Sequence, residues 1–301
     1  WLTDVLPHGE VRTLTSRVRR VVAPNPGPMT GPGTNTYIVG DTDLVVVDPG
    51  PAEPSHIDAI LACVDDRLRF IACTHTHPDH SPAAAVLAEA TGAGLVGRVT
   101  ADDRHQDLTF QPATQIEDDD TISGSDWTLR AIRTPGHVDN HVCFLLEEEG
   151  MVFAGDHIMN GSTVVIVPPG GNMSDYIASL RRLLDYDVKV VAPGHGELIP
   201  DCRGEVEKLV RHRLMREAKV AAALDHDPRS LDNRKVDGGV CLTARVRLDV
   251  GVVGAKEVLG ALDGEFLDAI NVFATAVVAF AGVAFRILVG QNRALCFDYG
   301  G

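Results

Sequence analysis

Nine consecutive residues, CTHTHPDHS at positions 73–81, place three histidines and one aspartate within a single short stretch of the chain. The apolar run LRFIAC before them predicts a β-strand that ends at Cys73. Ser81 and Pro82 predict the start of a helix over residues 83–91, with Ser81 as N-cap and Pro82 in the first turn. The imidazoles therefore lie on a strand-to-helix turn, either in a metal site or in an exposed histidine-rich turn.

Three later segments each end an apolar run with a residue type that binds metals. The segment AIRTPGH ends at His137, MVFAGD ends at Asp156, and KVVAPGH ends at His195. A glycine precedes each of these residues and permits a tight turn from strand to loop. Strand ends at one edge of a sheet are where α/β proteins build their sites. Five histidines and two carboxylates provide enough ligands for two metal ions, with Asp156 able to bridge them.

The remaining pattern interleaves strands with helices, which predicts an α/β chain with mixed sheets. A loop rich in proline and glycine is expected over residues 24–37. Strands are expected at residues 11–24, 38–39, 44–48, 68–73, 127–133, 142–146, 151–154 and 188–192. Helices are expected at residues 57–64, 83–91, 174–185 and 204–224.

The composition argues against a nucleic-acid-binding, disulfide-linked or membrane protein. The chain has 301 residues and a formal net charge of −15, which argues against a surface built to bind nucleic-acid phosphates. Its six cysteines form no CxxC pair and are interpreted as reduced core thiols of a cytoplasmic protein. The uncharged stretch 269–285 is short for a membrane span and is predicted to be a buried helix or strand, so no membrane association is expected.

Other common site motifs are absent or incomplete in the sequence. The loop sequence GPGTN is followed by no Lys-Ser/Thr pair and does not match a dinucleotide-binding fingerprint. No GxSxG motif for a serine nucleophile is present. The acidic run at residues 117–120 is predicted to be a solvated turn.

The motifs THTHPDH (74–80), TPGH (134–137), GD (155–156) and PGH (193–195) occur in an order that resembles the metallo-β-lactamase fold superfamily. The strand VVVDPG at residues 45–50 adds to this resemblance, which covers roughly residues 10–220. It implies an αββα sandwich with a dinuclear zinc site at one edge. The implied ligands are His75, His77 and His137 for the first metal, Asp79, His80 and His195 for the second, and Asp156 as the bridge. Asp79 and Asp156 are the residues we also expect to be catalytic.

Asp156 also suggests a subgroup, because true β-lactamases of this superfamily lack the bridging aspartate. The chain is similar to glyoxalase II-like hydrolases and, more narrowly, to the lactamase-beta-like subgroup. The supporting segments are residues 24–28, 31–37, 155–159, 164–169 and 212–217. Members of this subgroup include thioester and ester hydrolases, and some cleave single-stranded RNA.

Five further residues are expected around the metals. Asp48 is predicted to be a buried residue that orients the metal-binding loop. His141 and His157 are predicted to support the ligands or to form the pocket wall. Ser162 and Tyr176 are candidates for lining the pocket.

The resulting prediction is a dinuclear zinc-dependent hydrolase that uses a metal-bridging hydroxide on an ester or thioester. Iron or manganese would suit the same ligands. The alternatives are a single-stranded RNA endonuclease, a β-lactam hydrolase, and a metal-binding protein without turnover. A small acyl molecule is the expected substrate, RNA is a possible partner, and a homodimer is possible.

Two regions are expected along the chain. Residues 1–224 are predicted to form the catalytic domain, and residues 225–301 an atypical C-terminal extension. The valine-rich sequence of this extension does not match the helices that usually follow in the family. It is either a divergent extension or the product of a changed reading frame near residues 225–240.

Overall fold

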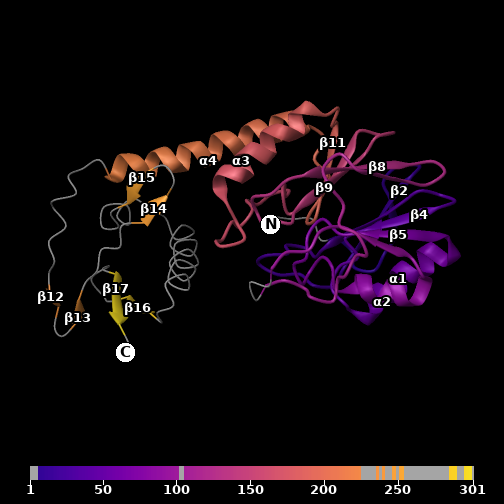
Figure 1. Ribbon diagram of the computed structural model, residues 1–301, viewed down its shortest axis with the longest axis horizontal. Helices are drawn as coiled ribbons and strands as arrows, with labels where there is room; N and C mark the ends of the chain where they lie inside the picture. Colours follow the sequence, from indigo (N-terminus) through magenta and orange to yellow (C-terminus); the bar gives the residue numbers. More distant parts are fainter. Residues whose placement is uncertain are drawn as a thin grey trace. The chain divides into compact units, whose positions relative to one another are not determined.

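The computed structural model describes residues 6–101 and 105–224, together with six short strands between residues 235 and 299. The chain divides into two compact units, residues 1–208 and 209–301. The boundary predicted near residue 224 and the nature of the extension remain predictions. All the predicted site residues belong to the first unit, whose sheets and helices are shown in Figure 1.

The first sheet has six strands in chain order. They are β1 (Arg12–Thr13), β2 (Val18–Val22), β3 (Asn35–Val39), β4 (Leu44–Val47), β5 (Leu68–Ala72) and β6 (Gly94–Val96). Strands β1 to β4 pair antiparallel, whereas β4, β5 and β6 pair parallel. Strand β4 is buried along its whole length, which explains the unbroken apolar run LVVV in place of an alternating pattern.

The second sheet has five strands in the order β11-β10-β9-β8-β7. They are β7 (Thr121–Ser123), β8 (Thr128–Arg133), β9 (Val142–Leu146), β10 (Met151–Gly155) and β11 (Val190–Pro193). Strands β7 to β10 pair antiparallel, and β11 pairs parallel with β10.

The helices are α1 (Pro54–Val64), α2 (Ala83–Thr91), α3 (Met173–Arg182) and α4 (Cys202–Leu224), with 3-10 turns at Asp65–Arg67 and Leu183–Asp185. Ile57, Ile60 and Val64 of α1 pack with Leu87 of α2 and with Val46 of β4 on the outer face of the first sheet. This helical spacing of apolar residues is the one the sequence displays.

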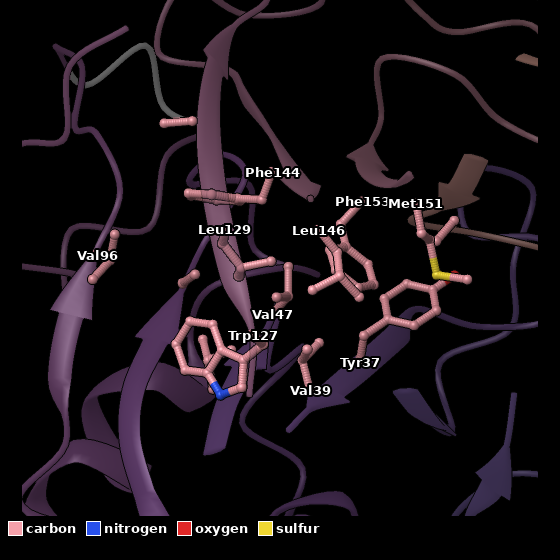
Figure 2. Packing of buried hydrophobic residues seen from close by; sticks show 14 of the residues in the cluster. Tyr37, Val39, Val47, Val96, Trp127, Leu129, Phe144, Leu146, Met151 and Phe153 are labelled. Carbon is pink, nitrogen blue, oxygen red and sulfur yellow. The ribbon is translucent and has the colours of Figure 1, made fainter. Parts of the chain in front are cut away.

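The main core lies between the two sheets. Figure 2 shows Tyr37, Val39 and Val47 from the first sheet in one cluster with side chains from the second sheet. Among the latter, Phe144 and Phe153 are almost fully buried. Two sheets that share one apolar layer, with helices outside, confirm the predicted αββα class.

Several expected boundaries were wrong. The strand predicted over residues 11–24 is two strands, because the Thr15 hydroxyl accepts hydrogen bonds from the backbone of Arg17 and Val18 and closes a turn between them. The loop predicted to reach residue 37 ends earlier, since β3 begins at Asn35. Strands β6 and β7 were not predicted, and each has only three residues.

The predicted N-cap of α2 was also wrong. Pro82 occupies the N-cap position, and no side chain accepts a hydrogen bond from the first turn. The Ser81 hydroxyl instead donates to Asp107 Oδ2 at 2.6 Å. This bond ties the turn after the histidine cluster to the loop around Asp107, so the serine stabilises tertiary structure in place of the helix end.

Other expectations concern the surface and the cysteines. Residues 117–120 are exposed around a turn, as predicted. Cys73, Cys143 and Cys202 are buried free thiols, and Cys63 is a partly exposed one.

Of the apolar stretch 269–285, only Phe285 at the start of β16 lies within the described residues. In the part of the chain that the structure describes, no helix combines the length and the hydropathy that crossing a membrane requires.

The strands of the C-terminal part pair as hairpins. They are β12 (Lys235–Val236), β13 (Gly239–Val240), β14 (Val246–Leu248), β15 (Gly251–Val253), β16 (Phe285–Val289) and β17 (Leu295–Tyr299). Antiparallel pairs form between β12 and β13, β14 and β15, and β16 and β17.

Candidate metal centre

The loops after β5, β8, β10 and β11 bring all seven predicted ligands together. Three overlapping groups form, and within each group the ligand atoms lie within 4.8 Å of one another. The groups are His75, His77 and His137; His75, His80 and Asp156; and Asp79, His80 and His195. These residues come from segments up to 120 positions apart, so the sheet edge is what assembles them.

In the three-histidine group, the ring nitrogens point at one another. Nδ1 of His77 lies 3.0 Å from Nε2 of His75 and 2.9 Å from Nε2 of His137. The Thr74 hydroxyl donates to Asp48 at 2.9 Å, so at 3.0 Å it accepts from Nδ1 of His75.

The other nitrogen of His137 is fixed in the same way. Its Nδ1 lies 2.6 Å from the carbonyl oxygen of Val165, which only accepts, so Nδ1 carries the proton. The Nε2 lone pairs of His75 and His137 therefore both face Nδ1 of His77, which has at most one proton to donate. Three converging imidazole nitrogens with too few protons suit a bound cation.

In the second group, too, the Nδ1 atom of each histidine lies within hydrogen-bond distance of an acceptor. Nδ1 of His80 lies 3.0 Å from Asp48 Oδ2, and Nδ1 of His195 lies 3.2 Å from the carbonyl oxygen of Gly33. Both Nε2 atoms then face a carboxylate: Asp79 Oδ2 lies 3.4 Å from Nε2 of His80 and 3.3 Å from that of His195.

Asp156 lies between the groups. Its Oδ1 is 3.4 Å from Nε2 of His80 and 3.2 Å from Nε2 of His195. Its Oδ2 is 3.6 Å from Nε2 of His137. One carboxylate thus presents one oxygen to each group, and most of these separations exceed a normal N–H···O hydrogen bond.

Burial and charge give the two groups different protonation. Burial lowers the pKa of His75 well below its usual range and that of His77 to about 4, so both rings are neutral and each keeps one nitrogen lone pair. For His195, burial opposes protonation, but Asp156 and Asp79 outweigh it and raise the pKa to about 9. Burial likewise opposes protonation of His80, yet Asp79, Asp156 and Asp48 raise its pKa.

The carboxylates respond in the opposite direction. Burial alone would raise the pKa of Asp156, but His195 and His80 lower it well below its usual range. In the absence of a metal, protons on the two histidines therefore balance the buried negative charge. A divalent cation provides the same compensation, and nitrogen and oxygen donors of this kind fit zinc, iron or manganese.

Asp48, predicted to orient the loop that carries the histidines, contacts that loop through its side chain. Its backbone has a φ of 49°, a conformation that aspartate tolerates better than most residues. Oδ1 accepts the Thr74 N–H at 2.7 Å, and Oδ2 accepts from the Thr74 hydroxyl and from His80. The side chain is buried, so these bonds have no competition from solvent.

Replacing Asp48 with asparagine should weaken metal binding by about 10- to 100-fold, since an amide accepts fewer hydrogen bonds than a carboxylate and leaves His80 poorly oriented. Competition with a chromophoric chelator measures this affinity. Asp43→Asn is the matched control, because Asp43 pairs with Arg69 away from the ligands. Equal affinities for Asp48→Asn and the unmodified protein would show that Asp48 has no such role.

Glycines beside the ligands are required for two different reasons. Gly155 has a φ of 45°, and a Cβ there would collide with the Thr74 side chain. Gly194 has no unusual φ, but a Cβ there would lie 2.7 Å from Cε1 of His80 and 3.0 Å from Asp156 Oδ1. The predicted tight turn thus explains Gly155, whereas close packing against the site explains Gly194.

The other predicted site residues lie behind the ligands or apart from them. The His141 ring stacks on His75 with centroids 5.1 Å apart, and its Nδ1 lies 2.8 Å from the Thr134 hydroxyl oxygen. His157 is buried between His141 and Tyr176, whose hydroxyl donates to the His157 carbonyl at 3.1 Å.

Ser162 is partly exposed in the segment that follows β10. A role for Ser162 or for Tyr176 in lining a substrate pocket remains a prediction.

Besides Asp48, the groups that hydrogen-bond to the candidate ligands were not predicted from the sequence. Thr74 received no role, although a hydroxyl between a strand end and the first histidine is a signal for such an orienting bond. The carbonyl groups of Val165 and Gly33 carry no sequence signal, because any residue supplies one.

The chain is similar in sequence to one protein family and to several of its members. Residues 29–195 match the family model described as the metallo-beta-lactamase superfamily. The lactamase-like protein aptB of Emericella nidulans is 30% identical over 236 residues, covering 77% of this chain and 73% of its own length. The atrochrysone carboxyl ACP thioesterase nsrC of Aspergillus novofumigatus is 30% identical over 295 residues, covering 97% of this chain and 84% of its own.

The fold also has counterparts among solved structures. A metallo-beta-lactamase family protein from Thermus thermophilus superposes with a TM-score of 0.62. It is 20% identical in sequence, and the match covers 96% of this chain and 100% of the other. At this identity the similarity concerns the fold alone.

Proposed function

The chain belongs to the metallo-beta-lactamase superfamily and is a hydrolase, and from this premise we propose that it is a dinuclear metal-dependent thioesterase. The observation that carries the proposal is the position of Asp156. Its Oδ1 faces His80 and His195, and its Oδ2 faces His137. A carboxylate placed in this way is suited to bridge two divalent ions.

The seven candidate ligands would bind two metal ions. His75, His77 and His137 would hold one ion; Asp79, His80 and His195 would hold the other; Asp156 would contact both. When bound, two such ions polarise an acyl oxygen and lower the pKa of water, which supplies a nucleophile near neutral pH. No serine or cysteine nucleophile is then needed.

The surrounding residues keep this constellation rigid. Asp48 holds Nδ1 of His80, and Thr74 holds Nδ1 of His75, so the Nε2 lone pairs stay directed into the site. The ligands are largely buried, which strengthens their electrostatic effect on a bound carbonyl group. Asp79 is the more exposed of the two carboxylates, with 26% of its side chain accessible against 12% for Asp156.

A thioester is the substrate class we favour. The relative nsrC is named as a carboxyl ACP thioesterase, and a second relative with that activity in its name, dmxR1 of a Cryptosporiopsis species, is 29% identical over 266 residues. We therefore propose an acyl thioester, presented on a carrier protein, as the substrate. The net charge of −15 disfavours RNA as the substrate. Zinc as the native metal, a homodimer and a cytoplasmic location remain predictions.

A substrate panel tests this proposal. Acyl thioesters, single-stranded RNA and the β-lactam nitrocefin are each incubated with the protein, with and without a metal chelator. The proposal predicts chelator-sensitive hydrolysis of thioesters, with RNA and nitrocefin cleaved far more slowly. Chelator-sensitive cleavage of RNA with inert thioesters would replace the thioesterase with a nuclease. Preferred turnover of nitrocefin would identify a β-lactamase.

A further inference from the structure

The segment around His195 is fixed by hydrogen bonds to the backbone carbonyl groups on both sides of the histidine. These carbonyl groups belong to Pro193, Gly194 and Gly196, and all three accept hydrogen bonds from strands of the other sheet. Because these carbonyl groups flank His195, their donors restrain the backbone that carries the imidazole.

Asn35 supplies most of these bonds. Its side-chain Nδ2 donates to the carbonyl of Pro193 at 2.9 Å and to that of Gly196 at 2.8 Å. Its backbone N–H donates to the carbonyl of Gly194 at 2.7 Å. Asn35 is 0% exposed, so solvent does not compete for these bonds in the intact protein.

Two neighbours in the first sheet add to this arrangement. The Tyr37 hydroxyl donates to the carbonyl of Pro193 at 2.8 Å, while its ring packs on Phe153 with centroids 5.0 Å apart (Figure 2). Burial raises the pKa of Tyr37, so the phenol keeps its proton and remains a donor. Arg20, which is 1% exposed, donates to the carbonyl of Gly196 at 3.3 Å and pairs with Glu197 at 2.9 Å.

These donors contact the segment of one metal ligand, His195. Among the described residues, Asn35, Tyr37 and Arg20 contact the His195 segment, whereas the three-histidine group is oriented by Thr74 and by the carbonyl of Val165. We infer that Asn35 is a positioning residue for His195 and thereby sets the metal affinity of the group Asp79, His80 and His195. This inference rests on the proposed dinuclear site and adds a residue that controls one half of it.

Metal titration of the full-length protein by isothermal calorimetry tests the inference. Asn35→Ala should lower the affinity for one of two zinc equivalents by about 10- to 100-fold and leave the other unchanged. The same substitution should have no further effect in a His195→Ala background, since that variant already lacks a ligand of the affected group. If Asn35 only stabilised the fold, Asn35→Ala would also weaken binding of the zinc equivalent held by the three-histidine group. It would do so both in the otherwise unmodified protein and in the His195→Ala variant.

One further variant serves as a control and another as a second test. Asn160→Ala removes a bond of the same type, to the carbonyl of Glu197 at 2.9 Å, and should keep both equivalents at full affinity. Tyr37→Phe removes only the hydroxyl and should weaken the same equivalent by a smaller factor, which provides the test even where Asn35→Ala does not fold.

Three results would overturn the inference. They are equal affinities for Asn35→Ala and the unmodified protein, parallel weakening of both equivalents, and an equal effect of Asn160→Ala. An unmodified protein that binds fewer than two zinc ions would instead contradict the proposed dinuclear site. The two failures are thereby distinguishable.

Discussion

Replacing Asp156 with alanine is expected to lower the rate of thioester hydrolysis by about 1,000-fold or more, since metal-ion stabilisation of the reaction amounts to several kcal/mol and each 1.36 kcal/mol is a factor of ten. The carboxylate faces both ligand groups, so its loss affects both. It also removes one of the two carboxylates that face both His80 and His195, the other being Asp79. Steady-state kinetics and elemental analysis on the same preparation measure the two effects together.

The matched control for this variant is Asp139→Ala. Asp139 is an exposed aspartate two residues after His137, so the substitution makes the same chemical change beside the site without touching a ligand atom. It should retain normal turnover and normal metal content. If Asp156→Ala also turned over normally, the carboxylate would not be shared between two ions.

Removal of metal is expected to have the second largest effect, on both activity and stability. A ligand present at about 1,000 times its dissociation constant stabilises the folded state by about 4 kcal/mol. For a unit of this size the melting temperature should therefore fall by on the order of 10 °C after chelation. Without a cation, the lone pairs of His75 and His137 both face His77, which adds to the loss.

Differential scanning calorimetry before chelation, after chelation and after addition of zinc measures this effect. Zinc should restore both the melting temperature and thioester hydrolysis. The Asp156→Ala variant should show a much smaller change on chelation, because it has less metal to lose. An unmodified protein that melts at the same temperature in all three states would show that the cluster does not bind metal.

The fold was largely predictable because its strands are apolar runs of ordinary length. Strand β9 begins and ends at the predicted residues, and α4 begins within two residues of its predicted start and ends at its predicted end. Two of the errors arose where a side chain acts against local preference. Ser81 bonds to Asp107 instead of capping α2, and Thr15 closes a turn inside the run 11–24.

The clustering of the seven candidate ligands was predictable because each follows an apolar strand and strand ends meet at one edge of a sheet, whereas their division between two metals came from the family resemblance. Apart from Asp48, the groups that hydrogen-bond to these residues could not be named, since those bonds join distant segments. Asn35 and Gly196 are 161 positions apart, and nothing in the sequence indicates that the amide of one meets the carbonyl of the other. Thr74 shows the intermediate case, a residue inside the motif whose role became clear only from its bond to Asp48.

The number of metal ions per chain tests the dinuclear site most directly. Protein purified without chelator is analysed by inductively coupled plasma mass spectrometry against a protein concentration from amino-acid analysis. The ligand geometry predicts close to two ions per chain, with zinc, iron or manganese as the element. Less than one ion per chain in folded protein that takes up no added metal would contradict the dinuclear site.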